Sequence, residues 1–185
     1  LKQDNSVVND LSEYSHKSRK KGCKDISVLF AYDIELMEPI CSEVFPGNMI
    51  DAKAYSAFIR DNNITKGVVV DDKGFPPSQI KKELSDSPDL HFLTPLKRNA
   101  KVIAKYGMYS FEGPLADYEG VWFKKVHMEN GNFLISYKDV RRAASEEMNY
   151  NNQKRRTGNF DPEDYKRKDD RFGTIVFETD IDLDP

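Results

Sequence analysis

The sequence is poor in cysteine, histidine and tryptophan, and it lacks long apolar runs. Its two cysteines, Cys23 and Cys41, are widely separated and have no Cys-x-x-Cys partner. Three scattered histidines do not supply the ligand spacing of a zinc site, and two free thiols are expected rather than a disulfide. No apolar stretch approaches the roughly 18 residues of a membrane span. We therefore expect a cytoplasmic protein without a membrane partner.

What the sequence does contain is typical of a globular domain. Hydrophobic residues make up 38% of the 185 residues and charged residues 32%, with eleven Phe and nine Tyr available for a core. This composition lies on the polar side of the globular range and excludes a disordered chain. The length suits one good-sized domain, or a core that carries a large insertion.

The charges are unevenly distributed along the chain. The net charge of −3 argues, as a sum, against a nucleic-acid partner. Lys and Arg nevertheless gather in three runs, at residues 16–24, 95–105 and 140–156, whereas acids collect in the C-terminal ETDIDLDP. One basic run alone is equally consistent with a solvated face. Three runs in one small protein predict a polyanionic partner.

Hydrophobic periodicity predicts alternating strands and helices in the first half of the chain. The predicted order is strand, strand, helix, strand, helix, strand, at residues 25–32, 36–45, 51–62, 67–70, 76–85 and 91–96. The first two strands form a hairpin, in which Pro39 indicates an edge or a bulge. Asp51 is the predicted N-cap of the first helix, and the wholly apolar Gly67–Val70 is typical of a strand buried on both faces. This pattern favours an α/β fold with a mixed sheet.

The pattern changes after Arg98. Residues 121–126 and 132–137 alternate in polarity around a turn-like HMENGN, which predicts a second hairpin. Residues 140–171 are charged and helix-prone, with an interruption at 158–162, and residues 174–178 again predict a strand. The second half therefore reads as mostly β structure with a charged helical stretch.

Two aspartates, Asp71 and Asp72, directly follow the predicted strand 67–70. Acids just past the carboxyl end of a sheet strand are placed where open α/β sheets hold functional groups. Three interpretations remain open from the residues alone: a cap for the following helix, a metal or catalytic ligand, or a solvent-exposed loop. Because side chains alternate along a strand, only one of the two carboxylates should face a metal site.

Four segments resemble those of insertion-sequence DDE transposases, in the order of that family. DDKGFPPSQIKKEL, at residues 71–84, resembles its Asp-Arg/Lys-Gly-Phe motif, and SEVFPGNMIDAKAY, at 42–55, is similar to its Gly-Asn-x-x-Asp segment. LHFLTPLKRNAKVI, at 90–103, and the basic lead into a strand at 12–33 also resemble the family. The likeness is specific over residues 10–105 and looser beyond, where VWFKK and FETDIDLDP are family-like.

The resemblance implies an RNase H-like fold, an α/β mixed sheet with flanking helices. Carried over, it implies a core at residues 1–96 without its first strand, a β-rich insertion with a charged helical stretch at 97–172 after the fifth core strand, and a return to the core at 173–185. We accordingly expect the chain to be the central fragment of such an enzyme.

The resemblance also implies an Asp, an Asp and a Glu that hold two Mg²⁺ or Mn²⁺ ions in the complete enzyme. By position, Asp72 is the second catalytic carboxylate, and Asp71 is the alternative metal ligand or its helper. Nothing apolar precedes Asp4, so it is a poor first Asp, and neither Glu146 nor Glu147 has the family's Tyr-x-x-Arg-x-x-x-Glu spacing. One carboxylate binds Mg²⁺ weakly. We therefore expect this fragment alone to be inactive and metal-free.

The implied activity of the full-length enzyme is metal-dependent DNA cleavage and strand transfer. The implied partner is double-stranded DNA, both element ends and target, with a homodimer in the transposition complex, in the nucleoid of a bacterium or archaeon. A non-catalytic DNA-binding or dimerising remnant and an RNase H-like nuclease are the alternatives.

Six residues outside the acidic motif are candidate DNA contacts. The cations could bind phosphates, with plain solubility as the alternative, and the aromatic residue could stack on a base, with a place in the core of the small β unit as the alternative. The candidates are Lys20, Lys21, Lys97, Arg98, Lys101 and Trp122.

Overall fold

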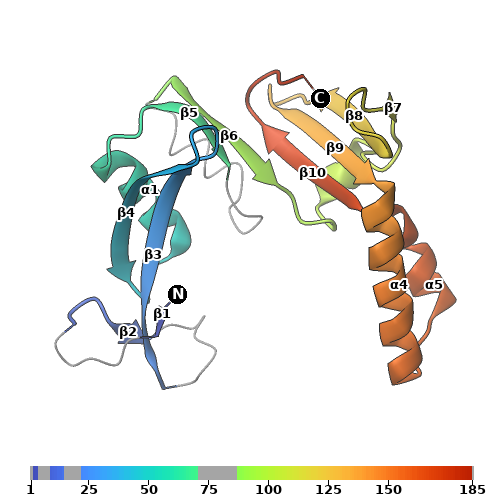
Figure 1. The fold of residues 1–185 in the computed structure, drawn as a ribbon, viewed down its shortest axis with the longest axis horizontal. Coiled ribbons are helices and arrows are strands. Elements are labelled where there is room, and N and C mark those ends of the chain that lie inside the picture. The colour runs from blue at the N-terminus through green and yellow to red at the C-terminus, as the bar shows by residue number, and fades with distance from the viewer. Residues whose placement is uncertain (1, 4–8, 15–21, 71–86, 185) are drawn as a thin grey trace. The chain divides into compact units, whose positions relative to one another are not determined.

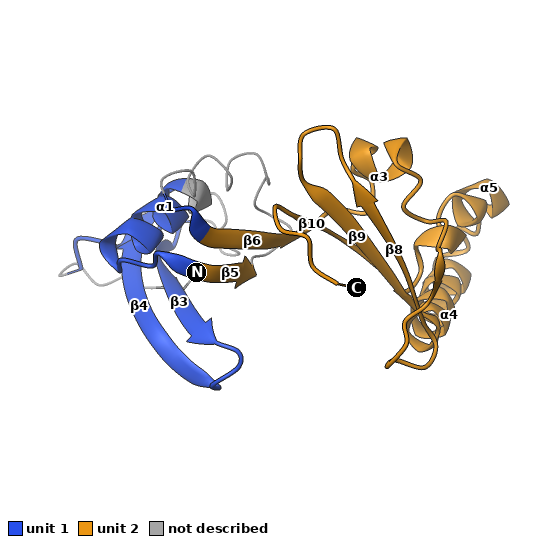
Figure 2. Cartoon of the chain, turned by 90° about the horizontal axis from the view of Figure 1, so that it is seen from above, with its two compact units in different colours: residues 1–66, 82–89 blue, residues 67–81, 90–185 orange. Residues whose placement is uncertain are grey.

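A computed structural model describes residues 2–3, 9–14, 22–70 and 87–184. The chain divides into two compact units (Figure 2). Unit 1 comprises Leu1–Lys66 with Lys82–Asp89, and unit 2 comprises Gly67–Lys81 with Leu90–Pro185. The predicted helix at 76–85 lies outside the described residues. The boundaries predicted at 96 and 172 remain predictions.

Unit 1 is built on a long antiparallel hairpin. Strands β3 (Lys24–Asp33) and β4 (Glu38–Pro46) pair from Ile26 opposite Pro46 to Asp33 opposite Glu38, which confirms the predicted hairpin (Figure 1). The register shifts between Ala31 and Tyr32, opposite the stretch that contains Pro39, which confirms the expected irregularity. The short strands β1 (Lys2–Gln3) and β2 (Glu13–Tyr14) also pair with β3.

Helix α1 (Asp51–Asp61) contributes the apolar core of unit 1. Its side chains Ala54 and Phe58, four residues apart on one face, are buried with Phe45 of β4. Asp51 is not the N-cap, and that prediction is wrong. Ile50 occupies the cap position with an extended backbone and no side-chain cap hydrogen bond, so the helical conformation has already begun at Asp51.

Gly47 lies in the turn between β4 and α1. The Met49 N–H donates to the Pro46 carbonyl at 3.0 Å and closes this turn. A Cβ on Gly47 would lie 2.0 Å from the Asp25 carbonyl oxygen on β3. The position therefore requires glycine, because the two backbone segments approach too closely for any side chain.

Unit 2 contains a six-stranded sheet in the order β5-β6-β10-β9-β8-β7. Its strands are β5 (Lys66–Val70), β6 (Asp89–Pro95), β7 (Gly113–Pro114), β8 (Val121–His127), β9 (Phe133–Asp139) and β10 (Thr174–Thr179). Strand β10 pairs antiparallel with β6 and with β9, and β8 and β9 form the predicted second hairpin. Figure 2 shows β5 and β6 running in the same direction, so the sheet is mixed.

Strand β5 forms where it was predicted, but it is not buried. Val68 is 44% exposed and Val70 is 54% exposed, so the expectation of a strand covered on both faces is wrong. Among the described strands, β5 stands at the end of the six-stranded sheet and pairs with β6 alone. An apolar run of four residues does not distinguish an edge strand from a central one.

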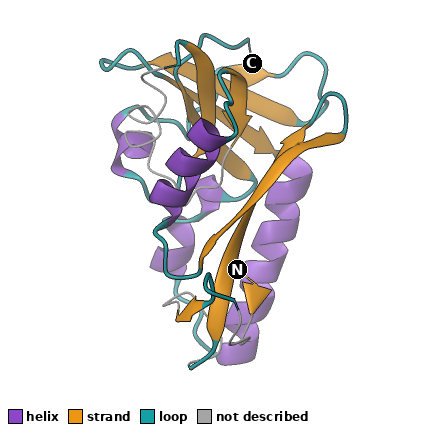
Figure 3. Ribbon diagram, turned by 90° about the vertical axis from the view of Figure 1, so that its left-hand side faces the viewer, coloured by secondary structure: helices purple, strands orange, loops and turns teal. Residues whose placement is uncertain are grey.

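The helices of unit 2 follow the predicted charged stretch. They are α3 (Lys101–Lys105), α4 (Val140–Thr157), α5 (Pro162–Lys166) and the 3₁₀ turn η1 (Asp169–Arg171). Helix α4 is the longest in the described part of the chain (Figure 3). The buried apolar core of unit 2 includes Ile103, Met108, Met128, Leu134 and Val176. None of the helices within the described ranges is long and apolar enough to cross a membrane.

The fold is therefore α/β with a mixed sheet, as predicted, and it is compatible with an RNase H-like architecture. The strands of the chain belong to two separate sheets. The hairpin β3–β4 belongs to the four-stranded sheet of unit 1, whereas β5 and β6 share the sheet of unit 2 with β7 to β10.

Candidate functional site

The two aspartates of the acidic motif come directly after Val70, the last residue of β5. Asp71 and Asp72 lie outside the described residues, as do the candidate DNA contacts Lys20 and Lys21. Their roles remain predictions. The structure establishes that the strand preceding the motif forms, and that it is an edge strand of the sheet in unit 2.

The described carboxylates near the end of β10 are engaged by other side chains. Asp180 lies 3.1 Å from His91 Nδ1 and accepts the Phe92 N–H at 3.0 Å. Glu178 accepts a hydrogen bond from the Asn132 amide at 2.6 Å. Residues 2–3, 9–14, 22–70 and 87–184 contain no group of three or more His, Cys, Asp or Glu that could hold a metal ion. Cys23 and Cys41 are both free thiols.

A polar cluster fixes the first half of α4. Arg98 donates from Nη1 and Nη2 to the two carboxylate oxygens of Glu146, at 2.7 and 2.9 Å. The same guanidinium donates from Nε to the Thr174 carbonyl at 3.0 Å. Glu146 also accepts hydrogen bonds from Arg142 Nε at 2.9 Å and from the Gly173 N–H at 3.0 Å. The cluster thus joins α4 to the segment after β6 and to the start of β10.

The electrostatics of this cluster favour an ionised Glu146. Its burial opposes ionisation, but the hydrogen bonds from Arg98, Gly173 and Arg142 outweigh that effect and lower the pKa of the carboxyl to about 2. Arg98 is one of the predicted phosphate contacts. Three of its donors are already used within unit 2, so a phosphate would have to compete with Glu146 and the Thr174 carbonyl.

Farther along α4, the same face contacts α5. Asp164 accepts hydrogen bonds from Tyr150 at 2.9 Å and from Lys168 at 2.8 Å, and these bonds lower the pKa of its carboxyl to about 2. Tyr165 donates to Glu147. The rings of Tyr150 and Tyr165 also pack around Phe172, with centroids 5.7 and 6.2 Å from it. Both glutamates of α4 therefore form hydrogen bonds with residues of unit 2 that lie outside this helix.

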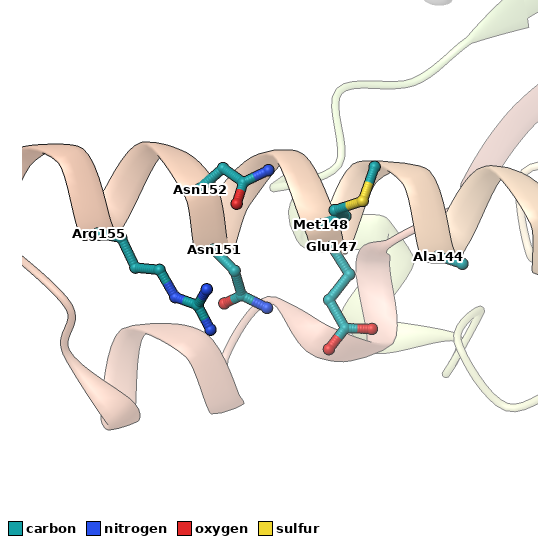
Figure 4. A pocket seen from close by; sticks show the side chains of 6 residues that line it. All are labelled: Ala144, Glu147, Met148, Asn151, Asn152 and Arg155. Carbon is teal, nitrogen blue, oxygen red and sulfur yellow. The ribbon is translucent and has the colours of Figure 1, made fainter.

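The outer side of α4 is exposed, and Glu147 is the acid at its border. Two shallow depressions run along the helix; one is shown in Figure 4, where Glu147 forms part of its edge. Asn152 lines both depressions, with Arg155 in the first and Arg156 in the second. The exposed face consists of Arg141, Ala144, Ser145, Met148, Asn149, Asn152, Arg155 and Arg156.

These surface residues were not among the candidate DNA contacts. The basic run at 140–156 was visible in the sequence, with five cations against two glutamates, but none of its residues was singled out as a DNA contact. A helical projection separates the charges, because residues 141, 145, 148, 152 and 155 follow one face at 3- and 4-residue spacing. A helical projection of the sequence could therefore have identified this surface.

The three remaining candidates lie on the surface of unit 2. Lys97 and Lys101 are exposed, before and at the start of α3. Trp122 on β8 lies opposite Lys138 of β9 and Pro114 of β7, and it is 43% exposed. The alternative of Trp122 as a core residue is therefore wrong. Contact of these three residues with DNA remains a prediction.

Comparison with protein-family models gives a match. The model described as "Transposase DDE domain" matches residues 6–182, which is nearly the whole sequence. Comparison with curated proteins and with solved structures gives no match. The family match spans both compact units and includes the segment that carries the two aspartates.

Proposed function

The chain belongs to the transposase DDE domain family, and from this membership we propose that it acts in metal-dependent cleavage and strand transfer of DNA. The family match over residues 6–182 is the observation that carries the proposal. A transposase function follows from the family in general terms. Beyond that, we propose the cutting and joining of DNA, the metal ions that these steps need and the residues that take part in them.

Asp72 is the proposed catalytic carboxylate of this chain. It stands in the Asp-Lys-Gly-Phe sequence directly after β5, and Asp71 is its neighbour and alternative. Mg²⁺ or Mn²⁺ bound in the full-length enzyme would activate the attacking oxygen and stabilise the leaving oxygen of phosphoryl transfer. Because Mg²⁺ needs several oxygen ligands, this chain on its own is proposed to be inactive.

The proposed substrate is double-stranded DNA, both the ends of a mobile element and a target. Lys97 and Lys101 are exposed and follow β6, so their ammonium groups are available for phosphates. Trp122 presents part of its indole ring to solvent on β8, where it could stack on an unpaired base. These contacts would position the DNA without determining its sequence.

The full-length protein encoded by the gene tests this function. It is incubated with a duplex that carries the element ends and with a target plasmid, in Mg²⁺ or Mn²⁺. Joined products are expected. Cutting without joining would instead identify an RNase H-like nuclease, and the absence of both would identify a non-catalytic remnant.

A further inference from the structure

We propose that the exposed face of α4 is a docking surface for double-stranded DNA. The surface comprises eight residues on one side of the helix: Arg141, Ala144, Ser145, Met148, Asn149, Asn152, Arg155 and Arg156. The choice of DNA over other polyanions rests on the proposed function. The location rests on the charge and exposure of α4.

One face of α4 packs against the rest of unit 2, and the other, called the open face below, is exposed to solvent. Glu146 is held by Arg98 and Arg142, and Glu147 accepts a hydrogen bond from Tyr165. Tyr150 contacts Asp164 on α5. No side chain of α4 is fully buried, so the packing of unit 2 does not explain the residues on its outer side.

The charges of α4 are unevenly distributed around the helix. Arg141, Arg155 and Arg156 are exposed, and no ion pair among the described residues engages them. The Arg155 side chain points to the same side of the helix as Glu147 and Asn151 (Figure 4). The acid nearest to this face, Glu147, borders one depression and is bonded to Tyr165. The open face is therefore cationic even though the whole chain carries a net charge of −3.

The length of α4 matches a short stretch of duplex DNA. Arg141 and Arg155 are separated by about 21 Å along the helix axis, at 1.5 Å per residue. This distance corresponds to roughly six base steps at 3.4 Å each. Cations near both ends of α4 can thus reach phosphates at two places on a duplex and fix the helix along it.

The residues that lie between the arginines on α4 are mostly polar. Asn149, Asn152 and Ser145 are exposed hydrogen-bonding side chains with no apolar neighbour larger than Met148 on the same face. Amide side chains can pair with adenine, and hydroxyl groups with several base edges or phosphates. The major groove of B-DNA admits an α-helix, whereas that of A-form RNA is too narrow. The surface therefore favours duplex DNA over duplex RNA.

The test measures binding of the 185-residue chain to a labelled 30-base-pair duplex by fluorescence anisotropy, across a series of salt concentrations. Arg141→Ala, Arg155→Ala and Arg156→Ala are combined in one variant. Affinity is expected to fall at least about tenfold at 0.1 M salt, and the salt slope to decrease by about 2 to 3. Because all three side chains are exposed, the thermal unfolding transition should not change.

A matched variant removes three exposed cations elsewhere, through Lys53→Ala, Lys66→Ala and Lys166→Ala. It should bind more tightly than the arginine variant, which separates the location of the charge from its amount. If the arginine variant proved unstable, the double variant Arg155→Gln with Arg156→Gln would replace it, and a loss of at least about threefold is expected.

Several results would overturn the proposal: equal losses in the two triple variants, no binding of duplex DNA by the chain, or tighter binding of duplex RNA. Self-association that depends on the arginines, without an effect on DNA, would assign the face to a second copy of the chain. Failure here is distinguishable from failure of the proposed function, because Asp72→Ala should leave duplex binding unchanged while it abolishes cutting by the full-length enzyme.

Discussion

Arg98 and Glu146 form a bidentate ion pair that holds α4 against unit 2. The two distances from Arg98 Nη atoms to Glu146 carboxylate oxygens are 2.7 and 2.9 Å. Arg98 Nε also donates a hydrogen bond to the Thr174 carbonyl oxygen at 3.0 Å. The two residues are 48 positions apart in sequence. The pair therefore fixes which side of α4 packs inward, and with it which side remains exposed.

Replacing Arg98 should destabilise unit 2. Arg98→Ala removes both hydrogen bonds to Glu146 and leaves that carboxylate with Arg142 and the Gly173 N–H alone. We expect a loss of about 2 kcal/mol in the free energy of unfolding, measured by urea denaturation. Arg98→Lys keeps the charge but not the bidentate geometry, so its loss should be intermediate. A free energy of unfolding for Arg98→Ala within about 0.5 kcal/mol of wild type would show that the ion pair does not stabilise the unit.

The stability of unit 2 should depend on pH through Glu146. The folded-state pKa of about 2 lies well below the ordinary value of a glutamate carboxyl, 4.5. This depressed pKa contributes stability that is fully present above about pH 5 and is lost as pH falls toward 2. Allowing for partial exposure, the contribution at neutral pH is on the order of 2 kcal/mol.

The variant Glu146→Gln reports this contribution directly. Its difference in unfolding free energy from wild type should be largest at neutral pH and should shrink between pH 5 and pH 2. The pKa of Asp164 is also lowered, to about 2, so Asp164→Asn serves as the matched variant that retains the Glu146 effect. A difference between Glu146→Gln and wild type that does not vary with pH would disprove the linkage.

Gly173 should not tolerate a side chain. Its φ is +71°, and a Cβ there would lie 2.4 Å from the Asp139 carbonyl oxygen and 2.6 Å from the Ala143 backbone nitrogen. Gly173→Ala should cost about 3 kcal/mol, because both strain and a backbone clash are introduced. Gly131 also has a positive φ, of +85°, but open space around it, so Gly131→Ala should cost only about 1 kcal/mol. Equal thermal shifts in the two variants would rule out the clash.

The N-cap of α4 should contribute measurably to helix stability. The Asp139 carboxylate accepts the N–H groups of Arg141 at 2.8 Å and Arg142 at 3.2 Å. Asp139→Ala should lower the free energy of unfolding by about 1 kcal/mol, and Asp139→Asn by less. Thermal unfolding followed by circular dichroism measures both. Indistinguishable curves for Asp139→Ala and wild type would show that this cap is not needed.

The local pattern of the sequence was sufficient for most elements of the fold. Runs of apolar and β-branched residues located the first hairpin, alternation located the second, and 3- and 4-residue spacing located α1. The pattern could not give the degree of burial of β5, because an edge strand and a central strand can have the same composition. It also missed that Ile50, not Asp51, precedes the first turn of α1, since cap positions depend on the backbone of the preceding turn.

The site was only partly accessible from the sequence. The Asp-Lys-Gly-Phe motif gave Asp72 as a candidate through a resemblance, and its role stays a prediction, whereas the family match confirms the resemblance itself. The partner of Arg98 could not be predicted, because Glu146 reaches it only through the pairing of β9 with β10 and the packing of α4. Surface charge suggested Arg98 as a phosphate contact, whereas tertiary structure gives its guanidinium an internal partner.

The role of Asp72 is tested most directly by DNA cleavage in the full-length enzyme. The variants Asp72→Asn and Asp71→Asn are compared with wild type on element-end duplex, in Mg²⁺ and in Mn²⁺. Loss of cleavage of at least about a thousandfold is expected for Asp72→Asn, with substantial activity retained by Asp71→Asn. Wild-type cleavage by Asp72→Asn would contradict the assignment, and loss confined to Asp71→Asn would transfer the role to its neighbour.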